Sequence, residues 1–168
     1  MNTVSSFNDA FLDGCSVDVS DDYTGPASRA LTDYWLSLAA AAPTGPRWTD
    51  VDLMAIPNVA PLTIVKDVVA EKDNRVNYVN RYWGTGITAS FGIDATGKEI
   101  AEYYSPRFVG QLRLLYDFLF TGRKLVRLSG RAKMFENHDS LLFESVQIPI
   151  YTAAGKPAHI LMAYDFSL

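Results

Sequence analysis

The sequence contains few of the residues that build metal centres, disulfides or membrane spans. Its 168 residues include one cysteine and two histidines. A single cysteine cannot form an internal disulfide or complete a structural zinc site, and His138 and His159 do not stand at metal-ligand spacing. No apolar run approaches the roughly 20 residues that cross a bilayer, and the N-terminus lacks the basic and apolar regions of a signal peptide. We therefore expect a cytoplasmic protein without a metal, a disulfide or a membrane span.

Positive charge and catalytic motifs are scarce as well. Lys and Arg number 15 against 19 Asp and Glu, and the net charge of −4 argues against a nucleic-acid partner. The sequence has no G-x-S-x-G elbow, no H-E-x-x-H pair and no P-loop. We expect no enzymatic activity, although a small-molecule-binding enzyme on an α+β fold stays open as the alternative.

The apolar content is sufficient for one folded domain. Hydrophobic residues make up 48% of the chain and aromatic residues 12%. Residues 1–26 are rich in Ser, Asp, Asn and Gly and are predicted to form a flexible arm, with Cys15 as an idle thiol. Residues 27–45 are predicted to form an amphipathic helix, because apolar side chains recur there at helical spacing. Residues 46–168 make up the main domain.

The patterns within 46–168 predict an α+β fold. The stretches "LTIVKDVV" and "RVNYVNRYW" are typical of two strands joined by the turn "EKDN". Short helices and one longer helix, "SPRFVGQLRLLYDFLFTG", follow, and three strands complete the chain. Because the strands are grouped and do not alternate with helices, we expect a five-stranded antiparallel sheet.

The stretch "RYWGTGITASFG" contains G-x-G-x-x-A, a variant of the dinucleotide-binding fingerprint, at Gly84, Gly86 and Ala89. A dinucleotide site needs a parallel strand–helix–strand unit, with an acidic residue about 20 residues further on. The strand before Gly84 is too polar for a parallel sheet, and no further strand–helix repeats follow. We therefore predict that the glycines turn a strand into a helix and hold no pyrophosphate.

The order of these elements resembles the PAS sensor fold, and more closely a group of bacterial stand-alone PAS proteins. In that group a helix with a Tyr-Trp pair precedes a proline-punctuated segment, here Tyr34-Trp35 and "DVDLMAIPNVAPLTIVKDV". A strand that ends in a Gly-Thr turn and an F-G-x-D-x-T-G-K-like run match "RYWGTGITASFGIDATGKEI". The closing hairpin "ESVQIPIYTAAGKPAHILM" is also similar, whereas the second glycine of "WGTGI" departs from the pattern.

The resemblance covers roughly residues 28 to 166 and implies sensing or signalling. A PAS domain holds a small molecule or cofactor between its sheet and helices, or holds nothing and mediates dimerisation. The implied role is a stand-alone regulator or adaptor that acts through an unknown signalling partner. Haem-binding PAS proteins usually carry a histidine on the long helix, which has none here, and flavin photosensors need a reactive cysteine beside the ring. The sequence therefore identifies no cofactor, and a structural dimerisation module without ligand stays open.

Two sets of candidate functional residues follow. Aromatic side chains, one methionine and one charge able to bind a carboxylate or phosphate could line a ligand pocket, or the aromatic side chains could only fill the core. The pocket set is Tyr78, Arg81, Tyr82, Phe91, Tyr116, Met134 and Tyr164. On the other face of the sheet we expect a cover formed by the N-terminal helix, from the same chain or from the partner in a homodimer. The interface set is Leu31, Tyr34, Trp35, Leu38, Leu125, Phe143 and Leu161.

Overall fold

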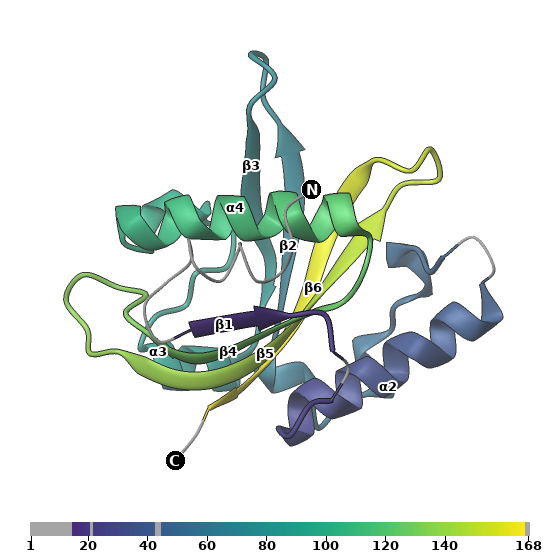
Figure 1. Cartoon of the computed structure of the whole chain (residues 1–168), viewed down its shortest axis with the longest axis horizontal. Coiled ribbons are helices and arrows are strands. Elements are labelled where there is room, and N and C mark those ends of the chain that lie inside the picture. Colours follow the sequence, from purple (N-terminus) through teal and green to yellow (C-terminus); the bar gives the residue numbers. More distant parts are fainter. Residues whose placement is uncertain (1–14, 21, 43–44, 167–168) are drawn as a thin grey trace.

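The computed structural model describes residues 15–20, 22–42 and 45–166. Its elements in chain order, shown in Figure 1, are β1 (Cys15–Asp18), α2 (Pro26–Ala41), β2 (Thr63–Ala70), β3 (Val76–Trp83), α3 (Thr85–Phe91), α4 (Pro106–Gly122), β4 (Val126–Ala132), β5 (Leu141–Tyr151) and β6 (Pro157–Phe166). Single turns of 3-10 helix lie in the connections: η1 (Trp48–Asp50), η2 (Leu53–Ala55), η3 (Ala60–Leu62) and η4 (Ile100–Glu102).

The strands form one antiparallel sheet in the order β1-β4-β5-β6-β2-β3. The hairpin β2–β3 pairs with the C-terminal strand β6, and its tip projects beyond α4 in Figure 1. The helices α3, η4 and α4 all lie in the connection from β3 to β4. This is the order that the PAS resemblance implied, so the predicted α+β fold class is confirmed, with one strand more.

The additional strand comes from the segment that was predicted to be a flexible arm. β1 pairs with β4, with Cys15 opposite Gly130 and Asp18 opposite Arg127. Cys15 is 8% exposed, and burial raises the pKa of its thiol to about 11. Four residues are too few for their alternation to distinguish a strand from a loop, which is why the pattern was not recognised. The arm prediction is wrong for this strand, and residues 1–14 lie outside the described residues.

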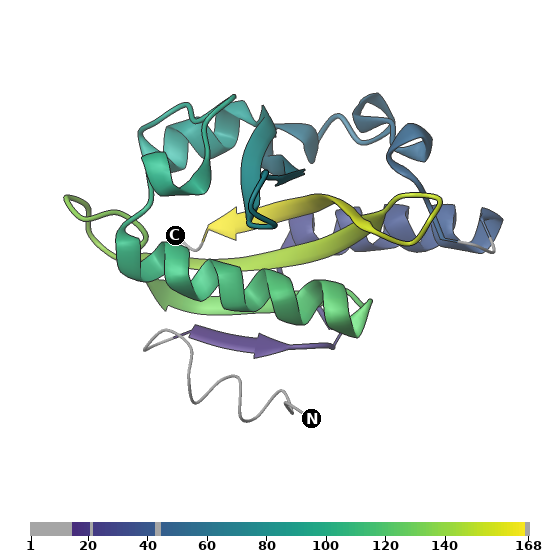
Figure 2. The same cartoon turned by 90° about the horizontal axis from the view of Figure 1, so that it is seen from above.

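Each face of the sheet carries its own hydrophobic core. The inner face packs against α3, η4 and α4, and the outer face packs against α2 and the turns η1 to η3. Figure 2 shows α4 and α2 on opposite sides of the sheet. Ser105 caps the N-terminus of α4, where its Oγ accepts the N–H of Phe108, and the helix buries Phe108, Leu112, Leu115 and Leu119 at helical spacing. Two layers of helix therefore enclose one sheet.

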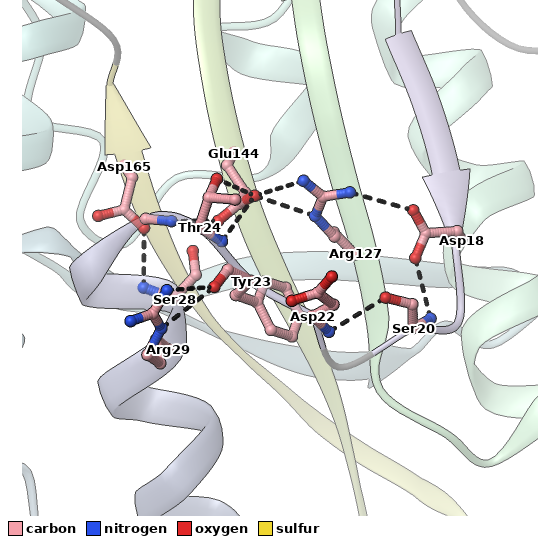
Figure 3. A network of polar contacts seen from close by, with 11 residues as sticks. Asp18, Ser20, Asp22, Tyr23, Thr24, Ser28, Arg29, Arg127, Glu144 and Asp165 are labelled. Atoms are coloured by element: carbon pink, nitrogen blue, oxygen red, sulfur yellow. Dashed lines mark hydrogen bonds and ion pairs between the residues drawn. The ribbon is translucent and has the colours of Figure 1, made fainter.

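α2 confirms the predicted N-terminal helix packed on the sheet, and two strand carboxylates hold its beginning. Oδ1 and Oδ2 of Asp165 accept the N–H groups of Ala27 and Ser28, each at 2.8 Å. Glu144 accepts the N–H of Gly25 at 2.7 Å (Figure 3). The first N–H groups of a helix have no partner within the helix, and they favour negative charge. The two carboxylates therefore fix where α2 begins on the outer face.

Arg127 completes this outer-face network. Its Nε and Nη2 donate to Glu144 at 2.9 and 2.7 Å, and its Nη1 lies 3.4 Å from Asp18 of β1 (Figure 3). Burial opposes ionisation of Glu144, but the donors of Gly25 and Arg127 outweigh it, and the pKa of Glu144 is lowered. The network thus ties β1, β4, β5 and the start of α2 together.

β3 contains a β-bulge that changes the predicted facing of its side chains. The register with β2 shifts between Asn80 and Tyr82, so Arg81 has no residue opposite it. One extra residue moves every later side chain to the other face. Tyr82 therefore packs in the outer core and Trp83 in the inner core. Simple alternation along β3 would put Tyr78 and Tyr82 of the predicted pocket set on one face, and the bulge places them on opposite faces.

One residue of the predicted interface set also lies on the unexpected face. Phe143 is buried in the inner core, where its ring centroid is 5.7 Å from that of Tyr164. In β5 it stands an odd number of residues from Ile148, which is opposite Leu161 on the outer face, and strand alternation separates the two. The other six members, Leu31, Tyr34, Trp35, Leu38, Leu125 and Leu161, all lie in or against the outer core.

The two glycines between β3 and α3 allow a close backbone approach. A Cβ on Gly84 would collide with the carbonyl group of Pro61, and one on Gly86 would press on Leu62. Gly84 has a φ of −65°, so close contact and not a positive φ explains the glycine. Every strand pairing in the described sheet is antiparallel, so the fingerprint lacks the context of a dinucleotide site.

Among the residues that the structure describes, no helix combines the length and the apolar character needed to cross a membrane.

Candidate ligand-binding site

β2 places one charged side chain inside the inner core. Lys66 is 1% exposed and stands between Ile64 and Val68 on the same face of the strand. The β-branched neighbours favour the extended chain, and the alternation then directs Lys66 toward the helices. The described residues supply Lys66 with hydrogen bonds but with no ion pair. A lysine buried without a carboxylate is unusual, because a charge loses its hydration on burial.

Two polar side chains contact the amine of Lys66. Its Nζ lies 2.6 Å from Oδ1 of Asn80 and 2.9 Å from the hydroxyl of Tyr103. Asn80 is fixed in turn, since its Nδ2 donates to the carbonyl of Ala95 and to the Tyr103 hydroxyl, each at 2.9 Å. The cluster joins β2, β3 and the segment around η4, so the amine is held between the sheet and the helices.

Three aromatic rings complete the surroundings of the amine. Nζ of Lys66 lies 5.9, 5.6 and 5.7 Å from the ring centroids of Trp83, Tyr103 and Tyr104. Burial lowers the pKa of Lys66 to about 7. The group therefore changes between ammonium and amine near neutral pH, and an anionic or strongly accepting group beside it would favour the ammonium.

A second polar group lies in the same core on β5. Nε2 of Gln147 donates to Oγ of Ser145 at 2.6 Å, whereas Oε1 of Gln147 is buried and has no hydrogen-bond partner among the described residues. Tyr164 stands opposite Ser145 in the β5–β6 register. Burial raises the pKa of Tyr164 to about 12, although its hydrogen bonds to Gln147 and Ser145 act in the other direction. An unpaired buried acceptor costs about 1–3 kcal/mol, so a hydrogen-bond donor to Oε1 of Gln147 would stabilise this part of the core.

Five of the seven predicted pocket residues meet in this core, namely Tyr78, Phe91, Tyr116, Met134 and Tyr164. The rings of Tyr78 and Tyr116 are 4.6 Å apart, and Phe91 contacts Trp83 and Tyr164 at 5.6 and 5.9 Å between centroids. Met134 is 1% exposed. The five predicted residues therefore belong to the same hydrophobic core as the polar groups described above.

The other two predicted pocket residues lie outside the inner core, Tyr82 because of the bulge and Arg81 because it follows the inward-facing Asn80 in the strand. Tyr82 donates its hydroxyl to the carbonyl of Ala60 at 3.0 Å on the outer side. Arg81 is exposed, and its Nε lies 2.7 Å from Oδ1 of Asp67, a carboxylate that also contacts His159. Neither side chain reaches the inner core, so the expectation that Arg81 binds a carboxylate there is wrong.

Sequence reasoning missed Lys66, and a signal for it was present. In "LTIVKDVV" the single lysine shares the parity of Ile64 and Val68, which marks it as inward-facing. Asn80 and Gln147 carry the same kind of signal, a polar residue at a core-facing strand position. Their convergence could not be foreseen, because it depends on the register between three strands.

The tyrosine hydroxyls of the inner core act as hydrogen-bond donors at neutral pH. Burial raises the pKa of Tyr78 to about 12 and those of Tyr104 and Tyr116 well above the ordinary value, so these hydroxyls stay protonated at neutral pH. Across residues 15–20, 22–42 and 45–166, no group of three His, Cys, Asp or Glu side chains could hold a metal ion. The site therefore offers an amine, hydroxyl donors and an unpaired acceptor within an aromatic shell.

No protein-family model matches the chain, and no curated protein matches it. Among solved structures, the chain is similar to the PAS-B domain of Drosophila melanogaster Cycle, in a variant with bound glycerol (TM-score 0.44, 11% identity, covering 62% of this chain and 99% of that one). It is also similar to the LOV domain of the blue-light photoreceptor Aureochrome1 in its light state (TM-score 0.44, 11% identity, 70% and 90%). A third is a sensory box histidine kinase/response regulator from Burkholderia thailandensis (TM-score 0.42, 11% identity, 68% and 84%).

Proposed function

We propose that the chain is a PAS-type sensory domain that binds a small molecule at Lys66 in the inner core and reports its presence through α2. The observation that carries this proposal is a fully buried lysine that has hydrogen bonds but no carboxylate among the described residues. A folded chain seldom keeps such a group for stability, because an apolar residue of similar volume would cost less. A negatively charged ligand would compensate the buried ammonium of Lys66, which would explain a lysine at this position.

The surroundings define the class of ligand. An anionic or strongly accepting group would bind Lys66, and the unpaired Oε1 of Gln147 would accept a donor from the same molecule. The aromatic shell of Tyr78, Phe91 and Tyr116 favours an apolar, planar body between the two polar ends. We therefore infer a small, mostly apolar molecule with a carboxylate or comparable acceptor at one end.

The sheet offers a short route from this core to α2. Ser145 and Tyr164 are opposite each other and face inward, and the next pair in the register, Glu144 and Asp165, faces outward. The outward pair binds the first N–H groups of α2. A ligand that displaces Ser145 and Tyr164 would therefore move the carboxylates that position α2. The paired strands β5 and β6 thus connect the ligand site in the inner core to the beginning of α2.

Output would then pass to another protein. α2 keeps Leu36 47% exposed, while Leu31 and Trp35 are buried against the sheet of the same chain. We infer a stand-alone cytoplasmic regulator or adaptor whose α2 is read by a signalling partner or by a second copy in a homodimer. A change in how α2 is held would change that contact.

Native mass spectrometry of the purified chain, repeated after denaturation, tests the proposal. A ligand would appear as a mass difference that denaturation removes, and Lys66→Met would lose it while the exposed control Lys133→Met would keep it. If the chain is ligand-free, a screen of aromatic carboxylates by thermal shift replaces the first step. An absence of any compound that stabilises the wild type more than Lys66→Met would refute the proposed site.

A further inference from the structure

A hollow of about 300 Å³ opens at one end of the molecule, away from the inner core. There the α4–β4 connection, the β5–β6 hairpin and the segment after α2 come together (Figures 1 and 2). Trp35, Leu125 and Pro149 give it an apolar lining, and three exposed basic residues, Arg47, Arg123 and Lys124, share that lining. Its volume is at the lower end of the range for small-molecule sites.

The three basic side chains have no carboxylate partner in the described part of the chain. The nearby Asp50 accepts the backbone N–H of Arg47 at 2.8 Å and leaves its guanidinium free of an ion pair. By contrast, Arg81 and Arg127 each bind a carboxylate at 2.7 Å. In a chain with more acidic than basic residues, three cations around one hollow repel each other without compensation.

The structure holds one of these cations in a fixed position. Arg123 has a φ of 55°, a left-handed conformation that costs a non-glycine residue roughly 1–2 kcal/mol. Its guanidinium lies 4.0 Å from the ring centroid of Tyr151, and the Tyr151 hydroxyl donates to the carbonyl of Phe120 at 2.8 Å. This conformation is the usual one at a helix C-terminus, where the N–H of Arg123 donates to the carbonyl of Leu119, and the stacked guanidinium keeps its N–H donors available.

We propose that this hollow is a second binding site, for a small anion whose phosphate or carboxylate group is held by Arg123, Lys124 and Arg47. The apolar part of the ligand lies against Trp35 and Leu125. Guanidinium groups bind both kinds of oxyanion through paired N–H donors. Trp35 belongs to the second half of α2, so this ligand contacts the helix far from its capped beginning. The site is independent of Lys66.

Isothermal titration calorimetry of the full chain at low salt tests the site with phenyl phosphate, benzoate and inorganic phosphate. Arg123→Gly is the decisive variant, because glycine accepts the φ of this position and the fold is retained. Arg75→Ala removes one positive charge from the distant β2–β3 turn and serves as the control. Lys66→Met separates this site from the inner core.

We expect phenyl phosphate or benzoate to bind the wild type, with a dissociation constant that rises at least about tenfold in Arg123→Gly and less than about twofold in Arg75→Ala and Lys66→Met. Whichever of the two aromatic anions binds more tightly identifies the oxyanion. Three results would overturn the proposal: neither aromatic anion binds, Arg75→Ala weakens binding as much as Arg123→Gly, or inorganic phosphate binds as tightly as both aromatic anions.

Discussion

The two faces of the sheet bury charged groups in opposite ways. On the outer face, Glu144 accepts hydrogen bonds from Thr24, Gly25 and Arg127, and these bonds compensate its charge and hold the beginning of α2. On the inner face, Lys66 is more deeply buried and has no carboxylate among the described residues. The outer arrangement is therefore a structural joint, whereas the inner one leaves Lys66 without a counter-charge among the described residues, which under our proposal a ligand supplies.

The largest expected effect comes from removing an apolar contact between α2 and the outer face of the sheet. Leu31 of α2 is 0% exposed in the outer core, so Leu31→Ala should lower the free energy of unfolding by about 3 kcal/mol. Leu36→Ala, on the 47% exposed side of the same helix, should change it by less than about 0.5 kcal/mol. Urea denaturation measures both. Equal effects would mean that α2 does not dock on its own sheet.

The next effect comes from removing the charge of Glu144, which holds the beginning of α2. Glu144→Gln removes the nearer of the two carboxylates that Arg127 contacts, and we expect a loss of about 2 kcal/mol at pH 7, against almost none for the exposed Glu136→Gln. Because the folded pKa of Glu144 lies below the ordinary value of 4.5, its contribution is present above that pH. The difference between wild type and Glu144→Gln should disappear as the pH falls through the folded pKa. A difference that persists in strong acid would contradict this account.

On the inner face, we expect a substitution to raise the free energy of unfolding, in contrast to the two outer-face substitutions. Lys66→Met removes an uncompensated charge, so we expect the ligand-free protein to gain about 1–3 kcal/mol at pH 7. Between the folded pKa of about 7 and the ordinary lysine pKa of 10.5, the unfolded chain binds more protons at Lys66 than the folded chain does. Wild-type stability should therefore rise relative to Lys66→Met across this interval. A destabilised Lys66→Met would show that the lysine already has its counter-charge.

The smallest effect concerns β1, which joins the outer network to the inner core. With a pKa of about 11, Cys15 is ionised to about a hundredth of the extent of a thiol with the ordinary pKa of 9.0. Alkylation at pH 8, followed by mass spectrometry, should be about 100-fold slower in the native protein than in urea. Labelling at the same rate in both would show that β1 is not paired with β4.

The sequence predicts the helices and the main strands because their periodicities are long. Leu31 to Leu38 and Phe108 to Leu119 each cover several turns, and the β2–β3 hairpin has a clear turn. β1 escaped prediction because four residues carry too little pattern. The bulge at Arg81 escaped because it is a property of the pairing of two strands, and a single strand does not encode it.

The candidate site is predictable only in part for the same reason. Its aromatic shell, with Tyr78 and Phe91, follows from composition and alternation. The polar centre requires Lys66, Asn80 and Gln147 to meet, and these residues lie on strands separated by long stretches of chain. An inward-facing lysine can be read from β2 alone, but the absence of a carboxylate beside it among the described residues emerges only from the fold.

The most direct test of the contrast between the two faces is the titration of Lys66 itself in the ligand-free protein. NMR signals of the lysine Cε–Hε groups, assigned by comparison with Lys66→Met, report its protonation as the pH is varied. We predict a midpoint near pH 7, well separated from the exposed lysines. A midpoint near 10.5 would mean that Lys66 is solvated or paired, and the proposed ligand site would lose its foundation.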